Sequence, residues 1–429
     1  MNPRELLASI LKKLMDKGAN KASLKYSAET DEEFNIVFKE LNLLRTVETN
    51  SVSIGVIKDQ KQASAKLNQF DEASIDQVLA EVMESVENSN PDPAFDISPK
   101  DEGSWTQGDL KPDADKVVFR LQEFISQTRE RFPDVHFDAT LAHEKSHDIY
   151  LNSNGASFED KSGTYGFNTV FTSKKGDKMS SMNFTGFQLG DLDRELLNIN
   201  FTSDLMRQSS EQIETRPIPE NFTGEVVIAP FLAMQLIYTF IQGQLADGGL
   251  LTKSSKFPDH LGQRILHPSL TLLNDHTHPD LCQRAHFTSD GFKSVSAPVI
   301  ENGVLKNYPV SLYAANKLGK KRTTGPVANL ILPPGEEPLA DIIGSVKQGI
   351  LCMRASFGNP NANGDFSGVI KNSYYIGDGR ISHPISETML NGNIIDMLNS
   401  VDAISSESFN TGRHIFPYLK IGDVYISKK

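Results

Sequence analysis

The sequence predicts an α+β protein built from two domains, and three observations lead to this class. The 429 residues, 38% of them hydrophobic, are enough for two ordinary hydrophobic cores. Segments that alternate apolar and polar residues, as antiparallel strands do, occur in both halves, between amphipathic helical segments. A Pro-punctuated linker, TRPIPENFTGE, places a boundary near residue 217. We expect an N-terminal α+β domain over residues 1–216 and a C-terminal, mostly antiparallel β domain with a few helices over residues 217–429.

The first ninety residues are predicted to fold in the order α-β-β-β-α. Apolar residues of the opening segment share one helical face, and Gly18 ends this helix. Strand patterns follow in NIVFKELN and LLRTVET, and SVSIGVIKDQKQASAKL predicts a hairpin that turns near Asp59-Gln60. Residues 71–88 then form an amphipathic pattern whose acidic start favours a helix N-terminus.

The rest of the N-terminal half begins with a segment rich in Pro, Asp, Ser and Gly, residues 88–115, which is typical of a long connection or a surface strap. A helix is predicted over residues 114–132. Alternating runs from Val135 to about Thr202 predict antiparallel sheet, and DLMRQSSEQIE predicts a helix.

The second half opens with VVIAPFLAMQLIYTFI, which predicts a strand followed by a buried helix. Residues 247–294 are rich in loop signals, and residues 294–319 show a strand pattern with a hairpin turn at Asn302-Gly303. Residues 338–355 predict a helix leading to a strand. The tail from Gly364 alternates turns with strands.

Composition limits the function. The formal net charge is -12 and the sequence pI is about 5.4, which argues against nucleic-acid binding and against an anionic membrane surface as partners. Two cysteines in a chain of this length form no disulfide framework, and the N-terminus has no secretory h-region. We expect a cytoplasmic protein.

The segment HEKSH matches the zinc-protease pattern HExxH at His143, Glu144 and His147. That pattern needs a helix, because only helical spacing places residues i and i+4 on one metal. Both flanks alternate as strands do, so we interpret HEKSH as a polar hairpin connection with exposed histidines. The sequence predicts a decoy here, with no metal and no catalytic role.

Two further candidates are weaker. His276, His278, Cys282 and His286 lie in one polar loop, but their spacing matches no closed zinc site. Cys352 has apolar neighbours, which favours a buried strand cysteine over a nucleophile. From the residues alone, no catalytic constellation is complete.

Ordered blocks along the chain resemble the TldD/PmbA family, in particular its PmbA (TldE) branch, also known as modulators of DNA gyrase. These blocks include IYLNSNGASFEDKSG, FTGEVVIAPFLAMQLI, VIENGVLKNYPVSLYAANKLG, NLILPPGE and GDFSGVIKNSYYIGDGRISHPISETMLNGNIIDMLNSV. The resemblance runs nearly end to end. Three stretches depart from the family's pattern: HFTSDGF (286–292), GSVKQGILCMRASFG and TTGPVAN.

The resemblance implies that a zinc helix, HExxxH in the TldD branch, should lie at residues 230–241, with a distant Cys completing the site. Here those residues read PFLAMQLIYTFI, and the matching tail has His414 but no Cys. It therefore implies a subunit without its own zinc, and a TldD-like catalytic partner that carries the zinc. Such complexes mature small peptides and degrade unfolded polypeptides. The isolated chain is also expected to be able to form a homodimer.

Three functions are carried forward. The leading one is a non-catalytic, substrate-handling subunit of a TldD/TldE-type metallopeptidase. The second is a self-sufficient metallopeptidase that uses His143 and His147, or His276 and His278. The third is a regulatory binding protein for a gyrase or toxin–antitoxin partner. For a peptide groove or subunit seam we select Asn363, Asp365 and Ser367, because small and amide-bearing residues allow close backbone approach; ordinary turn chemistry is the alternative.

Overall fold

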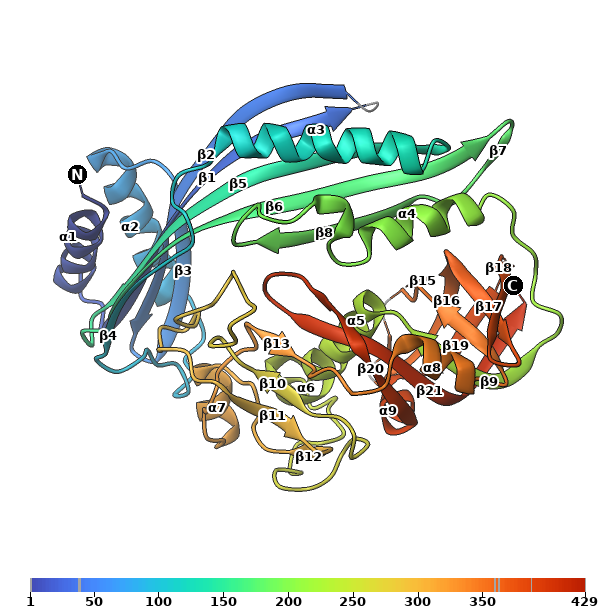
Figure 1. Ribbon diagram of the computed structural model, residues 1–429. Helices are drawn as coiled ribbons and strands as arrows, with labels where there is room; N and C mark the ends of the chain where they lie inside the picture. Colours follow the sequence, from blue (N-terminus) through green and yellow to red (C-terminus); the bar gives the residue numbers. More distant parts are fainter. Residues whose placement is uncertain (1, 38–39, 359, 362, 387, 429) are drawn as a thin grey trace.

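The computed structural model describes residues 2–37, 40–358, 360–361, 363–386 and 388–428. It contains two large sheets, one from each half of the chain, with helices packed on them (Figure 1). The predicted α+β class is confirmed. Strands of the first sheet lie within residues 21–189 and those of the second within residues 222–428. The boundary at residue 217 falls between these two stretches and stays a prediction.

The first sheet has long, curved strands in the order β3-β2-β1-β5-β6-β4, with β7 and β8 also paired to β6. All pairs are antiparallel except β4 with β6. The strands are β1 (Lys21–Val37), β2 (Glu40–Lys58), β3 (Lys61–Leu67), β4 (Glu102–Gln107), β5 (Val135–Asn152), β6 (Ser157–Lys175), β7 (Lys178–Met179) and β8 (Asn183–Leu189).

Helices cover only one face of this sheet. At one end, α1 (Pro3–Asp16) and α2 (Glu72–Glu87) pack on residues such as Leu24 and Ile54. At the other end, α3 (Ala114–Arg131) and α4 (Thr202–Glu211) pack on residues such as Phe167. Because strand side chains alternate, the other residues of each strand point to the opposite face. We call this the open face, since no helix of the first half covers it (Figure 1).

The second sheet follows the order β12-β11-β10-β13-β21-β9-β14-β17-β18, with β15, β16, β19 and β20 attached beside this path. Its strands are β9 (Phe222–Ile228), β10 (Leu272–Asn274), β11 (Ala297–Glu301), β12 (Val304–Leu305), β13 (Leu330–Ile331), β14 (Gln348–Cys352), β15 (Arg354–Ser356), β16 (Asp365–Lys371), β17 (Ser373–Gly377), β18 (Arg380–Ile385), β19 (Thr388–Asn393), β20 (Val401–Asn410) and β21 (Ile415–Lys428).

Short helices accompany the second sheet. They are α5 (Pro230–Phe240), a π-helical turn Ile241–Leu245, α6 (Asp247–Leu251), α7 (Leu312–Leu318), α8 (Leu339–Ser345) and α9 (Ile394–Asn399). Helix α5 is the central one, because its buried face packs against β21 in the main core of this half, which also includes Val226 and Ile228 of β9. A 3-10 turn, Leu196–Asn198, belongs to the first half, where it contacts α3 and α4.

Most predicted elements are confirmed. The hairpin turns at Asp59-Gln60, both with positive φ, and at Asn302-Gly303. The predicted helices at 71–88, 114–132 and 204–214 correspond to α2, α3 and α4. The strand pattern at 35–42 spans the end of β1 and the start of β2, and residues 38–39 lie outside the described residues.

Three predictions of local structure are wrong. HEKSH is not a hairpin connection, because it lies in the middle of β5. The strand pattern over residues 294–319 ends in a helix, α7, which Ser311 caps by accepting a hydrogen bond from the Ala314 N–H. The strap over residues 88–115 contains strand β4, which pairs in parallel with β6.

Candidate functional site

His143 and His147 sit on one face of β5, in the gap between the two helix pairs. In a strand, residues i and i+4 are separated by about 13 Å, too far for two imidazoles to share one metal ion. His143 is 1% exposed and its Nε2 lies 2.7 Å from the Asp109 carbonyl oxygen. The Nε2 atom of His147 lies 2.8 Å from Glu159 Oε1. The sequence interpretation of exposed hairpin histidines is therefore wrong for His143, although the two histidines do have separate partners.

Glu159 contacts His147 and two cations, Arg4 and Lys161. Burial raises its pKa, but hydrogen bonds from Lys161, His147 and Arg4 outweigh burial and lower the pKa of Glu159 to about 2. The HEKSH segment is therefore a structural part of the sheet on its helix-covered side, where each histidine has a local hydrogen-bond acceptor.

Glu144 points the other way, to the open face. Gln188 Nε2 donates to both of its carboxylate oxygens, at 3.0 and 2.9 Å. Asp31 lies directly opposite it on β1, and Glu29 is one diagonal position away. Burial, then the charges of Asp31 and Glu29, raise the pKa of Glu144 against the hydrogen bond from Gln188. Two acids directly opposite each other are an unfavourable pair, so this part of the sheet is electrostatically strained.

A cleft of about 660 Å³ lies over these acids, between the open face and loops of the second half. Residues 283–289, 326–328 and Arg413 form its other wall. His286 lies in this wall, with Nδ1 2.8 Å from Asp160 Oδ2 and its ring stacked on Trp105 at 5.2 Å. Acidic, basic and neutral polar side chains from both halves of the chain therefore line the cleft.

The loop histidines do not form one metal site. His276 Nδ1 lies 3.0 Å from Ser296 Oγ, whereas His278 Nδ1 accepts a hydrogen bond from the Asp280 N–H. The rings of His276 and His286 are 6.5 Å apart, but His286 is held by Asp160. Burial raises the pKa of Cys282 to about 11, which disfavours a thiolate ligand. Across the described residues, no group of three or more His, Cys, Asp or Glu side chains is arranged to hold a metal.

Helix α5 occupies the position where the family resemblance implies a zinc helix. Its inner face is apolar and buried, and the residues exposed on its outer side include Gln235 and Tyr238. His414 does not complete a site either, since its Nδ1 accepts a hydrogen bond from the Leu330 N–H. Burial lowers the pKa of His414 to about 4. The residues at this position do not fit a zinc ion, because α5 offers no imidazole, thiolate or carboxylate. Cys352 is fully buried in β14, as its apolar neighbours predict.

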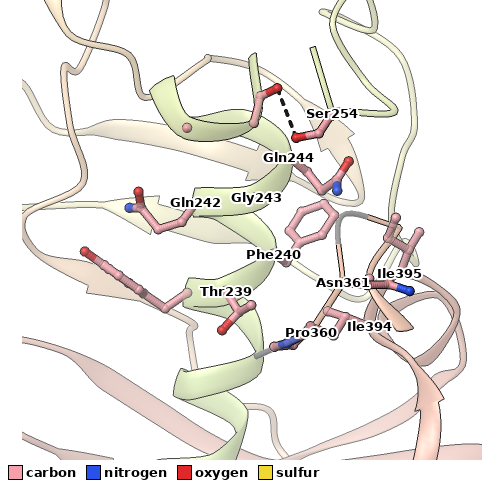
Figure 2. Close-up of a pocket in the computed structure, with 14 residues that line it drawn as sticks. Thr239, Phe240, Gln242, Gly243, Gln244, Ser254, Pro360, Asn361, Ile394 and Ile395 are labelled. Atoms are coloured by element: carbon pink, nitrogen blue, oxygen red, sulfur yellow. Dashed lines mark hydrogen bonds between the residues drawn. The ribbon is translucent and has the colours of Figure 1, made fainter. Parts of the chain in front are cut away.

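A pocket of about 430 Å³ opens at the C-terminal end of α5 (Figure 2). The helix widens here into the π-helical turn, a feature often found at functional sites. Phe240 and Gln244 lie on the side of the helix that faces residues 360–361 and the start of α9, whereas Gln242 points away from them (Figure 2). Phe240, Ile394 and Ile395 make the lining largely apolar. Gly243 leaves open space where a side chain would project. A pocket of this size and lining suits one apolar side chain with a few polar anchors.

None of the selected groove residues lines this pocket, although Asn363 and Asp365 flank Gly364, which does. The hydrogen bond from Asn393, then that from Asn361, lowers the pKa of Asp365. The Asn363 N–H donates to Asn361 Oδ1, and Ser367 Oγ lies 2.6 Å from Asn391 Oδ1. All three are exposed and tied into an amide network beside Gly364, which lines the pocket. Their role in peptide binding stays a prediction.

Comparison with known proteins places the second half of the chain in a class of metallopeptidase-type domains. Residues 222–428 match the family model described as PmbA/TldA metallopeptidase C-terminal domain. Similar proteins include the metalloprotease PmbA homolog of Haemophilus influenzae, 22% identical over 89% of this chain and 88% of that protein. Metalloprotease PmbA of Escherichia coli O157:H7 is 22% identical over 88% of this chain and 87% of that protein.

Solved structures share the whole fold. A candidate modulator of DNA gyrase from Bacteroides thetaiotaomicron superimposes with a TM-score of 0.87 at 19% identity, covering 99% of both chains. TldE from Thermococcus kodakarensis superimposes with a TM-score of 0.81 at 18% identity, covering 98% of this chain and 100% of that chain. These comparisons support the resemblance to the TldD/PmbA family that the ordered sequence blocks indicate, and residues 222–428 match the family's C-terminal domain.

Sequence reasoning missed the cleft over Glu144 and the pocket beside α5. Both join segments far apart in the chain, such as residues 144 and 286, or 243 and 361. The sequence contains a local signal only for the pocket: a Gln-Gly-Gln triplet and a Gly-Gly pair follow the apolar helix.

Proposed function

We propose that this protein is the non-catalytic, substrate-handling subunit of a TldD/TldE-type metallopeptidase, acting in the cytoplasm on peptides or unfolded polypeptides. The observation that carries the proposal is α5. At the position of the implied zinc helix, it has a buried apolar face and no metal-ligating side chain. A TldD-like subunit would supply the zinc and the peptide-bond chemistry.

Further features support this role. The cleft and the pocket beside α5 offer places for an extended chain and for an apolar side chain. Among the relatives are proteins named zinc metalloprotease TldD homolog and metalloprotease TldD homolog, which match about half of this chain. Both cysteines are free, as in a reducing compartment.

No helix in the described part of the chain is long and apolar enough to cross a membrane.

The test is metal analysis and a peptidase assay on the purified chain, alone and with a TldD-like subunit of the same organism. We expect less than about 0.1 zinc per chain, no hydrolysis of an unfolded polypeptide by the chain alone, and hydrolysis by the mixture with zinc in the partner. One zinc per chain together with activity in isolation would contradict the proposal. In that case, replacing His276 and His278 by Ala would test the self-sufficient alternative.

A pull-down distinguishes the regulatory alternative. Recovery of a gyrase or antitoxin component, with no TldD-like protein and no gain of peptidase activity on mixing, would favour a binding module over the proposed subunit.

A further inference from the structure

Arg354, on β15, is a largely buried cation with no carboxylate within ion-pair distance among the described residues. Its Nη2 donates to the Phe184 carbonyl, and its Nε lies 3.4 Å from Asn183 Oδ1. Its Nη1 is buried and has no partner at all. Burial lowers the pKa of Arg354 to about 10. A buried guanidinium without a counter-charge is costly, so its retention calls for an anionic partner.

Two aromatic rings hold the guanidinium in place. Its Cζ lies 4.2 Å from the ring centre of Phe184 and 4.4 Å from that of Phe231. The two rings are nearly perpendicular, at 87°, and form a corner around Arg354. Rings stabilise the cation through its faces, whereas N–H donors point outward in its plane. The corner therefore orients Arg354 without using up its donors.

Two buried amides beside this corner each have one atom without a hydrogen-bond partner among the described residues. Asn183 is 1% exposed with a free Nδ2, and Asn372 is 4% exposed with a free Oδ1. Asn372 is fixed next to Asn183, because its Nδ2 donates to the Met182 carbonyl. Arg354 and Asn183 thus offer free N–H donors, and Asn372 offers one free acceptor.

This set matches the last residue of a peptide. A terminal residue carries an α-carboxylate, which accepts from guanidinium and amide N–H groups, and its own backbone N–H, which donates. A phosphate or an acidic side chain supplies acceptors without that adjacent donor.

The surface around the corner is apolar. Met182 is 62% exposed, Phe184 39%, and Tyr238, two turns along α5 from Phe231, 42%. Phe184 covers the guanidinium, so rotation of this exposed side chain opens the way to it. An apolar C-terminal side chain would find matching contacts here.

The corner and the cleft lie on the same face of the first sheet. Phe184 and Gln188 both lie on the open face of β8, and Gln188 holds Glu144 at the cleft. Four strand residues span about 13 Å, so a peptide of four or more residues anchored at Phe184 reaches the acids at Glu144.

We propose that Arg354, Asn183 and Asn372 form a binding site for the free C-terminal carboxylate of a peptide that ends in an apolar residue. The substrate class in this inference, a peptide, rests on the proposed function. The binding test itself uses this chain alone.

The test is fluorescence anisotropy with a fluorescein-labelled alanine-rich octapeptide ending in leucine, compared with the same peptide as its C-terminal amide. We expect the amide to bind the wild-type chain about tenfold or more weakly, because a charged hydrogen-bonded contact is lost. The Arg354→Gln variant should bind the free acid more weakly than the wild type by a similar factor, and it should bind the amide as tightly as the wild type does. Arg194→Gln, which removes an exposed arginine elsewhere, should bind like the wild type.

Equal dissociation constants for acid and amide, or no binding at 1 mM peptide, would overturn the inference without any variant. An amidated peptide with an internal glutamate that binds as tightly as the free acid would also overturn it, in favour of acidic side chains. These outcomes leave the proposed function standing. Zinc and activity in the isolated chain would remove the proposed function while the carboxylate preference remained.

Discussion

At the scale of single residues, Glu144 shows how a motif can mark an informative position for the wrong reason. The two histidines of HEKSH lie on the helix-covered side of the sheet, whereas Glu144, the third residue of the zinc-protease pattern, faces the cleft. Its surroundings are unfavourable to charge: Asp31 lies directly opposite, and Gln188 keeps a buried Oε1 without a partner. Unfavourable electrostatic and hydrogen-bonding energy of this kind is typical of a binding surface rather than of a hydrophobic core.

Replacing Glu144 by Gln should therefore stabilise the protein at neutral pH. Folding raises the pKa of Glu144, so its charged carboxylate destabilises the folded state. This destabilisation is fully present above the pKa of the folded state and disappears below the pKa of the unfolded state, roughly 4.3. The introduced amide removes the like-charge pair and can also donate to Gln188 Oε1. We expect a gain of about 0.5–1 kcal/mol in the free energy of unfolding at pH 7, measured with urea.

The same experiment at about pH 3.5 should show no gain, since Glu144 is then protonated in both states. Glu48→Gln, at an exposed position, is the matched control and should change stability by less than about 0.5 kcal/mol. A gain that persists at low pH would show that charge is not its cause.

At the scale of secondary-structure elements, α5 is a packing helix, although it lies in the region that matches a domain model named after metallopeptidases. Leu236, on its buried face, is 3% exposed, and the next residue towards the N-terminus, Gln235, is exposed. Leu236→Ala should lower the free energy of unfolding by about 2–5 kcal/mol, because it opens a cavity in the main core. Gln235→Ala should change it by less than about 0.5 kcal/mol in the same urea titration. Equal stabilities of the two variants would contradict the packing of α5.

The elements also show what a sequence can predict. Helices α1, α2 and α3 were predictable because their apolar residues recur at helical spacing and their N-caps are Asn2, Asp71 and Asp113. β5 was misread at HEKSH because polar residues usually mark loops, yet here both neighbouring strands continue past the segment and keep it extended. β4 was missed because its partner, β6, lies fifty residues away and pairs in parallel.

The candidate site was less predictable than the fold. Asn363, Asp365 and Ser367 were chosen from local composition, and they lie beside a real pocket. The Arg354 corner had no such signal, because Phe184, Phe231 and Asn372 come from three segments that only the tertiary structure unites. Residues that act through unsatisfied hydrogen bonds cannot be recognised until their neighbours are known.

At the scale of the whole molecule, the two halves share one hydrophobic cluster. Phe167 and Phe171 of the first sheet belong to the same buried cluster as Val227, Leu351 and Tyr418 of the second. α4, which packs on β6, also belongs to this cluster and lies between the two sheets. Cutting the chain near residue 217 would expose large apolar side chains on both sides, which costs about 1.5–3 kcal/mol for each.

The chain should therefore unfold as one cooperative unit, although its sequence suggests two domains. We expect a single calorimetric transition whose calorimetric and van't Hoff enthalpies agree, because the shared cluster couples the halves. A fragment of residues 1–216 should bind a hydrophobic dye and lack a cooperative transition, since the cluster around Phe167 and Phe171 loses the members that the second half contributes. Two separate transitions, or a fragment that melts cooperatively, would show that the contact between the sheets is weak. The cleft and the Arg354 corner are built from both halves, so such weakness would also make their geometry variable.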